Sequence, residues 1–247
     1  MPTVLITGCS SGFGLATARL FLERGWNVVA TMRTPRADLL PASQRLRIVA
    51  LDVLDPESVR QAVAQSGPVD VLVNNAGIGL MGVFESTSMA TVRELFDTNL
   101  LGAMAMTQAV LPQFRERGAG VIVNVSSATT YKALPMLAAY TASKAALNAW
   151  TASLALELEA IGVRARLVLP GRSPETPFGR SAQQRMQAGA PEAYSGFVEK
   201  VFAGRSGDGT VTYALDVAEA VWRASTDASA PFSVPAGADA EAMAAHA

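Results

Sequence analysis

The chain alternates between short apolar runs and longer stretches whose apolar residues recur at helical spacing, and this order limits the folds open to it. Continuous apolar runs are typical of parallel strands that are buried on both faces. The apolar runs cover residues 3–7, 27–32, 46–52, 69–75, 120–126 and 163–170. The helical stretches cover residues 13–24, 56–65, 89–115 and 139–161. The alternation predicts an α/β fold, a doubly wound parallel sheet with helices on both faces and right-handed crossovers.

The pattern loosens after Gly171, where Gly, Pro and Ser stand among scattered aromatic residues. We expect residues 172–213 to form loops around one or two short helices that cover a substrate. A last helix near residues 215–225 precedes an expected edge strand and tail at residues 232–240. Half of the 247 residues are hydrophobic, which suits one domain over residues 1–247 with a sizeable core.

Composition excludes several classes of function. The 20 basic and 21 acidic residues nearly cancel, so no charge signature for nucleic acid or an anionic membrane is present. Cys9 is the only cysteine, which rules out an internal disulfide, and we see neither a leader segment nor a membrane-length apolar run. We therefore expect a cytoplasmic protein. The only histidine is His246, next to the end of the chain, so we expect neither a Ser-His-Asp triad nor a histidine-bound metal.

A glycine-rich loop joins the first expected strand to the first helix. In "LITGCSSGFGLATARLF", Gly8, Gly12 and Gly14 would let the backbone turn tightly and approach a pyrophosphate, whose charge then faces the positive end of the helix. The loop lacks the Gly-Lys-Ser/Thr of a P-loop, so an ATPase is disfavoured. The spacing predicts a dinucleotide site, with Cys9 as a small packing residue.

The residues after the second strand indicate which dinucleotide is bound. Folds of this kind usually hold the adenosine ribose of NAD with an acidic residue there, but this chain has Met32 followed by Arg33. A guanidinium can pair with a 2′-phosphate that a carboxylate would repel. The sequence therefore favours NADP(H) over NAD(H), with a merely solvated Arg33 as the alternative. Asp52 would receive the adenine amino group, with Val53 beside it.

One lysine stands on a helix that otherwise looks built for burial. In "YTASKAALNAW", Tyr140 and Lys144 are four residues apart and therefore share a helical face. Without a catalytic histidine, a tyrosine can exchange a proton with a substrate if its pKa falls from about 10 towards 7, a change of roughly 4 kcal/mol. One ammonium at about 4 Å supplies about that much at an effective dielectric constant of ~20. The pair predicts an acid–base site.

Taken together, the motifs resemble those of the short-chain dehydrogenases/reductases. The matching segments, in the order of that family, are "TGCSSGFG" (7–14), "LDV" (51–53), "NNAG" (74–77), Asn99 in "FDTNLLG", "NVSS" (124–127), "YTASK" (140–144) and "PG" (170–171). The resemblance covers residues 3 to about 171 and implies a single Rossmann-type domain, a nicotinamide cofactor and a Ser-Tyr-Lys site assisted by an Asn.

Carried over residue by residue, the resemblance selects Tyr140 and Lys144 as the Tyr-x-x-x-Lys pair. It selects Ser127 rather than Ser126, because the family's serine usually lies thirteen residues before the tyrosine. It gives Asn99 the role of holding a water that links the lysine to solvent. No metal ligand is implied. The residues expected to hold the cofactor are Gly8, Ser10, Ser11, Gly12, Phe13, Gly14, Arg33, Asp52, Val53, Asn75, Ala76, Gly77, Tyr140, Lys144, Pro170 and Gly171.

The substrate is less well defined. Residues 128–138 and the loop after Gly171 carry apolar groups, which favour a medium-sized, partly apolar carbonyl or alcohol, unless these groups only close the core. These groups include Met136, Phe178, Met186, Tyr194, Phe197 and Phe202. The family usually has Thr four residues after the Gly of Pro-Gly, but here Glu175 occupies that position and Thr176 follows it. Either the loop bulges by a residue, or Thr176 is not a ligand. Arg172 would bind a substrate carboxylate or point outward.

Two long helices are apolar around much of their circumference. Residues 139–161 offer a stripe formed by Leu147, Trp150, Leu154 and Leu158, with small Ala residues elsewhere. We expect the helices at 89–115 and 139–161 to pair between subunits in a homodimer or homotetramer, with tight packing inside a monomer as the alternative.

The leading hypothesis is an oxidoreductase that transfers a hydride between NADP(H) and a carbonyl or secondary alcohol, with Tyr140 as general acid and base. One alternative is a catalytically silent dinucleotide-binding regulatory protein of the same fold, which would need no proton route. Another is a methyltransferase that uses the glycine loop for a different cofactor, which would leave Tyr140 and Lys144 without a purpose.

Overall fold

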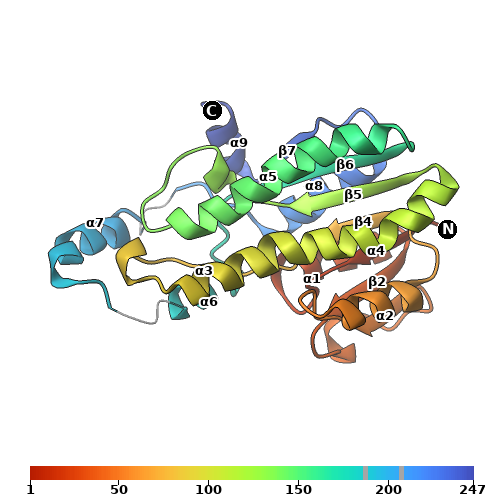
Figure 1. Cartoon of the computed structure of the whole chain (residues 1–247), viewed down its shortest axis with the longest axis horizontal. Helices are drawn as coiled ribbons and strands as arrows, with labels where there is room; N and C mark the ends of the chain where they lie inside the picture. Colours follow the sequence, from red (N-terminus) through yellow and green to blue (C-terminus); the bar gives the residue numbers. More distant parts are fainter. Residues whose placement is uncertain (186–188, 206–208) are drawn as a thin grey trace.

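Seven parallel strands form one sheet in the order β3-β2-β1-β4-β5-β6-β7 (Figure 1). The computed structural model describes residues 1–185, 189–205 and 209–247. The strands are β1 (Thr3–Ile6), β2 (Asn27–Met32), β3 (Leu46–Ala50), β4 (Val71–Asn74), β5 (Gly120–Val125), β6 (Val163–Pro170) and β7 (Ser233–Ala236). The predicted doubly wound parallel sheet is confirmed, and the expected strand near residue 232 is the edge strand β7.

Helices cover both faces of the sheet. They are α1 (Gly12–Glu23), α2 (Pro56–Ser66), α3 (Met89–Phe96), α4 (Gly102–Arg117), α5 (Ala138–Glu159), α6 (Phe178–Gln184), α7 (Ser195–Arg205), α8 (Ala214–Thr226) and α9 (Ala238–Ala244). Helices α1 and α8 pack on one face, where Phe21 and Val221 are fully buried. Helices α2, α4 and α5 pack on the other, around Phe114 and Ile122. Alternate side chains of each strand enter the two cores, which is why the strands read as continuous apolar runs.

Two features differ from the sequence expectations. The predicted helix at residues 89–115 is three segments, because a π-helical stretch, Asp97–Leu101, separates α3 from α4. π-Helical turns are rare and are frequent at functional sites. The expected tail after β7 is a further helix, α9, which follows Gly237 at a φ of 95°.

The apolar stripe on α5 faces inward rather than toward another subunit. Leu147, Leu154 and Leu158 are buried, and Trp150 packs partly buried against the same core. The stripe therefore packs within the chain, against β6 and the core on this face of the sheet. No helix in the described part of the chain is long and apolar enough to cross a membrane.

The sheet fixes where a ligand would bind. Strands β1 and β4 are neighbours, although the chain winds outward from β1 in one direction and from β4 in the other. In open parallel sheets, ligands bind beyond the carboxyl ends of the strands at such a switch point. The glycine loop follows β1 there, and Asn75 follows β4.

Candidate active site

Tyr140 and Lys144 lie in the first turns of α5 and are both buried, with 7% and 4% of their surfaces exposed. The Lys144 Nζ donates a hydrogen bond of 2.9 Å to the carbonyl of Val125, the last residue of β5. A Cβ added to Gly77 would lie 3.5 Å from this Nζ, so the segment after β4 closes on the amine. The end of the central sheet therefore holds the lysine in place.

Ser127, and not its neighbour Ser126, is the serine that acts on Tyr140, where hydrogen bonding by its hydroxyl works to lower the pKa of the phenol. Ser127 is the second residue after β5 and precedes the short turn η4 (Ala128–Thr130), and its Oγ accepts a hydrogen bond of 3.1 Å from the Thr129 hydroxyl. The Ser126 hydroxyl donates to Asn148 at 2.5 Å instead. Successive residues of an extended strand point in opposite directions, which separates the two serines.

Burial dominates the acidity of the pair. It raises the pKa of Tyr140 to about 12, and the hydrogen bond with Ser127 acts in the opposite direction. Burial also lowers the pKa of Lys144 to about 8. The expectation that the pKa of Tyr140 falls towards 7 is therefore wrong for this structure. Removal of the phenol from water penalises its anion, and the recorded hydrogen bond of Lys144 goes to Val125.

Asn99 lies in the π-helical segment and is 1% exposed. Its Oδ1 accepts from the Ile78 N–H at 2.8 Å, and its Nδ2 donates to the Ile78 carbonyl at 3.0 Å. The Nδ2 also donates to the Ser143 hydroxyl at 3.0 Å, which in turn donates to the carbonyl of Tyr140 at 2.7 Å. The amide thus ties the segment after β4 to the first turn of α5.

The glycine loop is packed against the end of β4. Gly8 has a φ of 75°, and a Cβ there would lie 2.9 Å from the Cα of Ala76. Asn75 Nδ2 donates to the carbonyl of Thr7 at 2.9 Å and to that of Gly8 at 3.2 Å. A Cβ on Gly14 would lie 2.5 Å from the same Nδ2. Only glycine permits this close approach and the left-handed backbone at position 8.

The same loop has the features of an anion site. Ser10 and Ser11 are exposed, and Ser11, the N-cap of α1, makes no side-chain bond to the helix it precedes within the described structure. The helix start therefore offers hydroxyl and N–H donors together with the positive end of the helix dipole. Phe13 instead packs partly buried against the core. Cys9 is fully buried, and burial raises the pKa of its thiol to about 12, as befits a packing residue.

The residues expected at the adenosine end follow β2 and β3, the strands on one side of β1 in the sheet. Met32 ends β2 and is buried, and the next residue, Arg33, is exposed. The backbone N–H of Asp52 donates to Ser58, and its carboxylate accepts from the Leu54 N–H at 3.0 Å, which shapes the turn after β3. Val53 is half-buried in the same turn.

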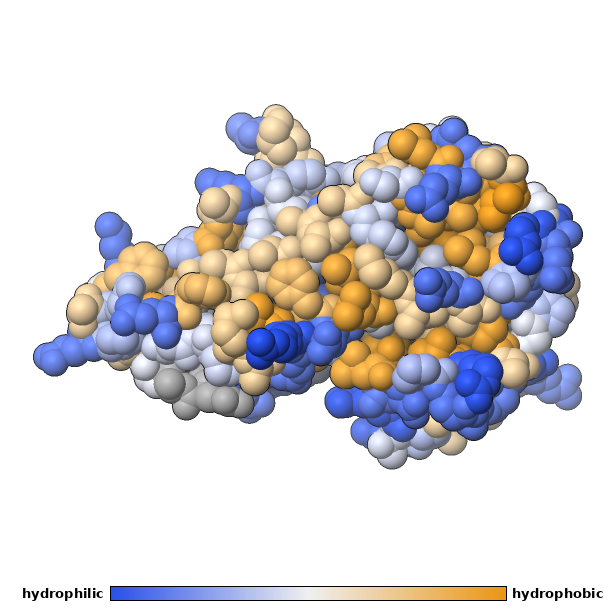
Figure 2. Space-filling view, viewed as in Figure 1, coloured by the Kyte–Doolittle hydropathy of each residue, from blue (hydrophilic) through white to orange (hydrophobic). Residues whose placement is uncertain are grey.

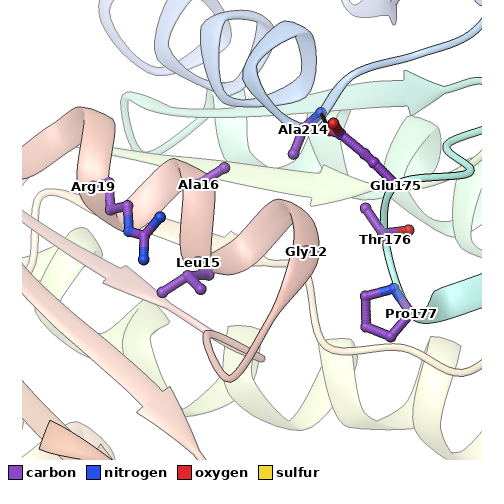
Figure 3. Close-up of a pocket in the computed structure, with 8 residues that line it drawn as sticks. All are labelled: Gly12, Leu15, Ala16, Arg19, Glu175, Thr176, Pro177 and Ala214. Carbon is purple, nitrogen blue, oxygen red and sulfur yellow. Dashed lines mark hydrogen bonds between the residues drawn. The ribbon is translucent and has the colours of Figure 1, made fainter. Parts of the chain in front are cut away.

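The loop after β6 resolves the offset between Glu175 and Thr176. The Glu175 carboxylate accepts a hydrogen bond of 2.5 Å from the N–H of Ala214, the first residue of α8. Thr176 is 5% exposed, and its Cβ and Cγ2 would each lie 3.5 Å from a Cβ on Gly12. Figure 3 shows Glu175 reaching toward Ala214 while Thr176 lies nearer the glycine loop. Of these two side chains, Thr176 is therefore the one that reaches the glycine loop.

Helix α6 covers the tyrosine. The Phe178 ring lies 5.8 Å from the Tyr140 ring, centroid to centroid, and a Cβ on Gly79 would lie 2.8 Å from the Phe178 ring. Met136 has a φ of 62°, rare for a side chain of its size, and is 8% exposed. Its carbonyl accepts a hydrogen bond of 2.9 Å from Gly82. The predicted substrate residue Met186 lies outside the described residues.

Three residues with roles in this arrangement were not singled out from the sequence. The Thr7 hydroxyl accepts from the N–H groups of Asn75 and Ala76, at 3.0 and 2.9 Å. Thr212 and Asp239 hold the turn that begins at Gly171. Thr7 stands in the glycine motif and could have been noticed, whereas Thr212 and Asp239 lie in segments without a recognisable pattern.

Comparisons with known proteins show which family the chain belongs to. Residues 2–187 match the family model described as short chain dehydrogenase. The chain is 36% identical over 211 residues to the uncharacterized oxidoreductase YusZ of Bacillus subtilis (strain 168), an alignment that covers 81% of this chain and 75% of that protein. It is 42% identical over 181 residues to retinol dehydrogenase 8 of Bos taurus, covering 68% of this chain and 58% of that one.

A solved structure has the same architecture along nearly the whole chain. It is a short chain dehydrogenase from Burkholderia cenocepacia J2315 in complex with NADP, with a TM-score of 0.78, 27% sequence identity, and coverage of 99% of this chain and 91% of that chain. The matched residues include the glycine loop, Ser127, Tyr140 and Lys144. The protein belongs to the short-chain dehydrogenase/reductase family of oxidoreductases.

Proposed function

We propose that the protein transfers a hydride between NADP(H) and a carbonyl or secondary alcohol, and that the chain acts as one cofactor-binding domain whose residues 172–213 cover the substrate. The observation that carries the proposal is the burial of Tyr140 one helical turn from the buried Lys144, with Ser127 acting to lower the pKa of the phenol. A protein that only binds a dinucleotide needs no such arrangement, which argues against the silent regulatory alternative.

The pKa values indicate how the residues share the work. With its pKa raised to about 12, the phenol of Tyr140 is protonated at neutral pH, the state in which it would give a proton to the oxygen of a carbonyl during reduction. The Ser127 hydroxyl is placed to donate a hydrogen bond to the same oxygen. The Lys144 ammonium lowers the cost of the tyrosinate that remains. The nicotinamide supplies the hydride, and we propose that Asn99 keeps the lysine in contact with solvent through a water.

Substrate binding relies on an apolar cover. Phe178 packs against Tyr140, and backbone hydrogen bonds join Gly82 to Met136 and Met81 to Ala182 of the same helix as Phe178. This cover favours a medium-sized substrate with apolar groups beside its carbonyl or hydroxyl. Retinol dehydrogenase 8, whose name states an apolar alcohol, is a relative in keeping with this class.

The proposal is tested by mixing the purified protein with NADPH and a panel of ketones and aldehydes. We expect the fluorescence of NADPH to increase when it binds. We also expect the absorbance of NADPH to fall as it is oxidised in the presence of at least one carbonyl. Fluorescence enhancement would favour the regulatory alternative if no carbonyl were reduced with NADPH and no secondary alcohol were oxidised with NADP⁺.

Cofactor preference depends on Arg33. We expect Arg33→Ala to weaken NADPH binding about tenfold or more, because an exposed guanidinium paired with a phosphate is worth roughly 1.5 kcal/mol. NADH binding should change less than twofold, since NADH carries no 2′-phosphate. Titration by fluorescence measures both, with Arg36→Ala as the control, because Arg36 already pairs with Asp38. An equal loss for both dinucleotides would exclude the assignment.

We also propose that α4 and α5 pair with a second copy, giving a homodimer or homotetramer. Apolar colours run across the face that these helices form (Figure 2). Leu101, just before α4, is 51% exposed, and Leu156 on α5 is 71% exposed. The outward residues of α5 at helical spacing are Ala142, Ala145, Ala149, Ala152 and Leu156. Small residues let two helices approach closely, and a two-fold axis would bring each stripe onto its copy.

Leu156→Glu should therefore dissociate the assembly, because a two-fold interface would bury two unpaired carboxylates. We expect sedimentation velocity to show a dimer or tetramer for the wild type. The variant should dissociate to monomer at protein concentrations at least a hundredfold higher than the wild type does. Leu215→Glu, at an exposed position on α8, is the matched control. A monomeric wild type would end this part of the proposal.

A further inference from the structure

Segments that are far apart in the sequence converge on the carboxylate of Asp239. This residue is the second of α9 and is 8% exposed. Its Oδ2 accepts a hydrogen bond of 2.6 Å from the backbone N–H of Arg172, and its Oδ1 accepts one of 2.7 Å from the Thr212 hydroxyl. Charged acceptors form the stronger hydrogen bonds, so this carboxylate is a firm anchor.

Thr212 extends the anchor to both sides of the turn after β6. It is fully buried, and its hydroxyl accepts a hydrogen bond of 3.0 Å from the N–H of Gly171. Its own N–H donates to the carbonyl of Arg172 at 2.9 Å. The backbone of residues 171 and 172 is therefore held by the Asp239 side chain on α9 and by Thr212, which precedes α8.

Two glycines make this close packing possible. A Cβ on Gly171 would overlap the Asp239 carboxylate. Gly237 has a φ of 95°, and a Cβ there would lie 2.7 Å from the Cα and Cβ of Thr212. The backbone at both positions can approach its partner only because no side chain is present. Glycine is therefore required both at Gly171, which faces Asp239, and at Gly237, which faces Thr212.

The anchored turn leads directly to the candidate cofactor site. Four residues beyond Arg172, Thr176 packs against Gly12 of the glycine loop, and Glu175 is fixed to the start of α8. Helix α9 also packs against η4, the turn that follows Ser127. A displacement of Asp239 would therefore be felt on both sides of the site.

We propose that Asp239 is a positioning residue that holds residues 171–177 against the glycine loop and so sets the affinity for the dinucleotide. The inference rests on the proposed function for the identity of the ligand, but its structural part can be tested without any ligand. Asp239 touches no reacting atom in this account, so its removal should affect cofactor binding more than turnover at saturating cofactor.

The experiment compares Asp239→Ala, Asp239→Asn and Thr212→Val with Glu241→Ala, which removes the same charge from an exposed position on the same helix. Hydrogen exchange is measured on the protein without ligand, and NADPH affinity is measured by fluorescence. For Asp239→Ala we expect amides of residues 171–177 and 212–214 to exchange at least tenfold faster, with strand β1 unchanged. NADPH should bind about tenfold more weakly, with kcat within about threefold.

The variants have distinct expected results. Asp239→Asn keeps one acceptor oxygen and should recover part of the affinity, Thr212→Val should show a smaller loss of the same kind, and Glu241→Ala should match the wild type. Unchanged exchange at residues 171–177, or faster exchange throughout the sheet, would overturn the positioning role. Faster exchange there with unaltered NADPH affinity would overturn the link to the cofactor. A wild type that binds neither NADPH nor NADH would instead refute the proposed function, while the exchange data would still decide whether Asp239 anchors the turn.

Discussion

Tyr140→Phe should reduce kcat by about a hundredfold to ten-thousandfold, the range that a positioned general acid contributes. The substitution keeps the ring against Phe178 and removes only the hydroxyl whose pKa Ser127 lowers. We expect NADPH affinity to stay within about threefold, because the rest of the cofactor cleft is untouched. Steady-state assays on the best substrate of the panel and fluorescence titration measure the two quantities.

Tyr213→Phe provides the control for this change, because it removes a phenolic hydroxyl from a side chain that is 56% exposed. Its turnover should equal that of the wild type. If Tyr140→Phe retained turnover within tenfold of the wild type, the acid–base role of the phenol would be untenable, whatever the structure places around it.

Lys144→Met should lower kcat by at least a hundredfold and shift the pKa that limits alcohol oxidation upward by more than one unit. Oxidation needs the tyrosinate as base, and the loss of a neighbouring ammonium makes that anion harder to form. The pH dependence of kcat/KM measures the shift. An unmoved profile would contradict the electrostatic role of the lysine.

The same substitution has a consequence for stability. Because burial lowers the pKa of Lys144 to about 8 from 10.5, the unfolded chain binds more protons between these values. The free energy of unfolding of the wild type should therefore rise from pH 8 to pH 10 by on the order of 2 to 3 kcal/mol, before the raised pKa of Tyr140 reverses the trend above pH 10. Urea unfolding should show this rise in the wild type and in the exposed-site control Lys200→Met, but not in Lys144→Met.

The parallel sheet and the helices around it could be predicted from the sequence because strand burial and helical spacing leave periodic patterns. Strands β2 and β6 and the glycine loop have the expected bounds within a residue or two. The pairing of Tyr140 with Lys144 on one helical face follows from helix geometry alone. The one-residue offset at Thr176 was visible in the sequence, but its cause, the bond from Glu175 to Ala214, depends on where α8 begins.

Other parts of the site depend on contacts that leave no local signal. The partner of Lys144 is a backbone carbonyl, and any residue at position 125 would supply it. The rise in the pKa of Tyr140 comes from burial, which is set by tertiary packing and includes cover from Phe178 of the irregular region after Gly171. Asp239 lies in an alanine-rich segment that resembles a tail. Periodicity therefore locates the reacting groups, but not the solvent exclusion that tunes them.

Lys144 is bonded to the last residue of β5, two residues before Ser127. The proposed acid–base residues and the proposed substrate cover are therefore built from different parts of the chain. Lys144, proposed to assist proton transfer, is bonded to the end of a central strand, whereas Phe178, proposed to meet a substrate, comes from α6. Exchanging residues 178–205 for the corresponding segment of a relative should thus retarget the enzyme to new molecules without rebuilding its chemistry. Proteins of this lineage can therefore diverge in substrate by changes in residues 178–205, while the residues at the end of β5 and on α5 stay the same.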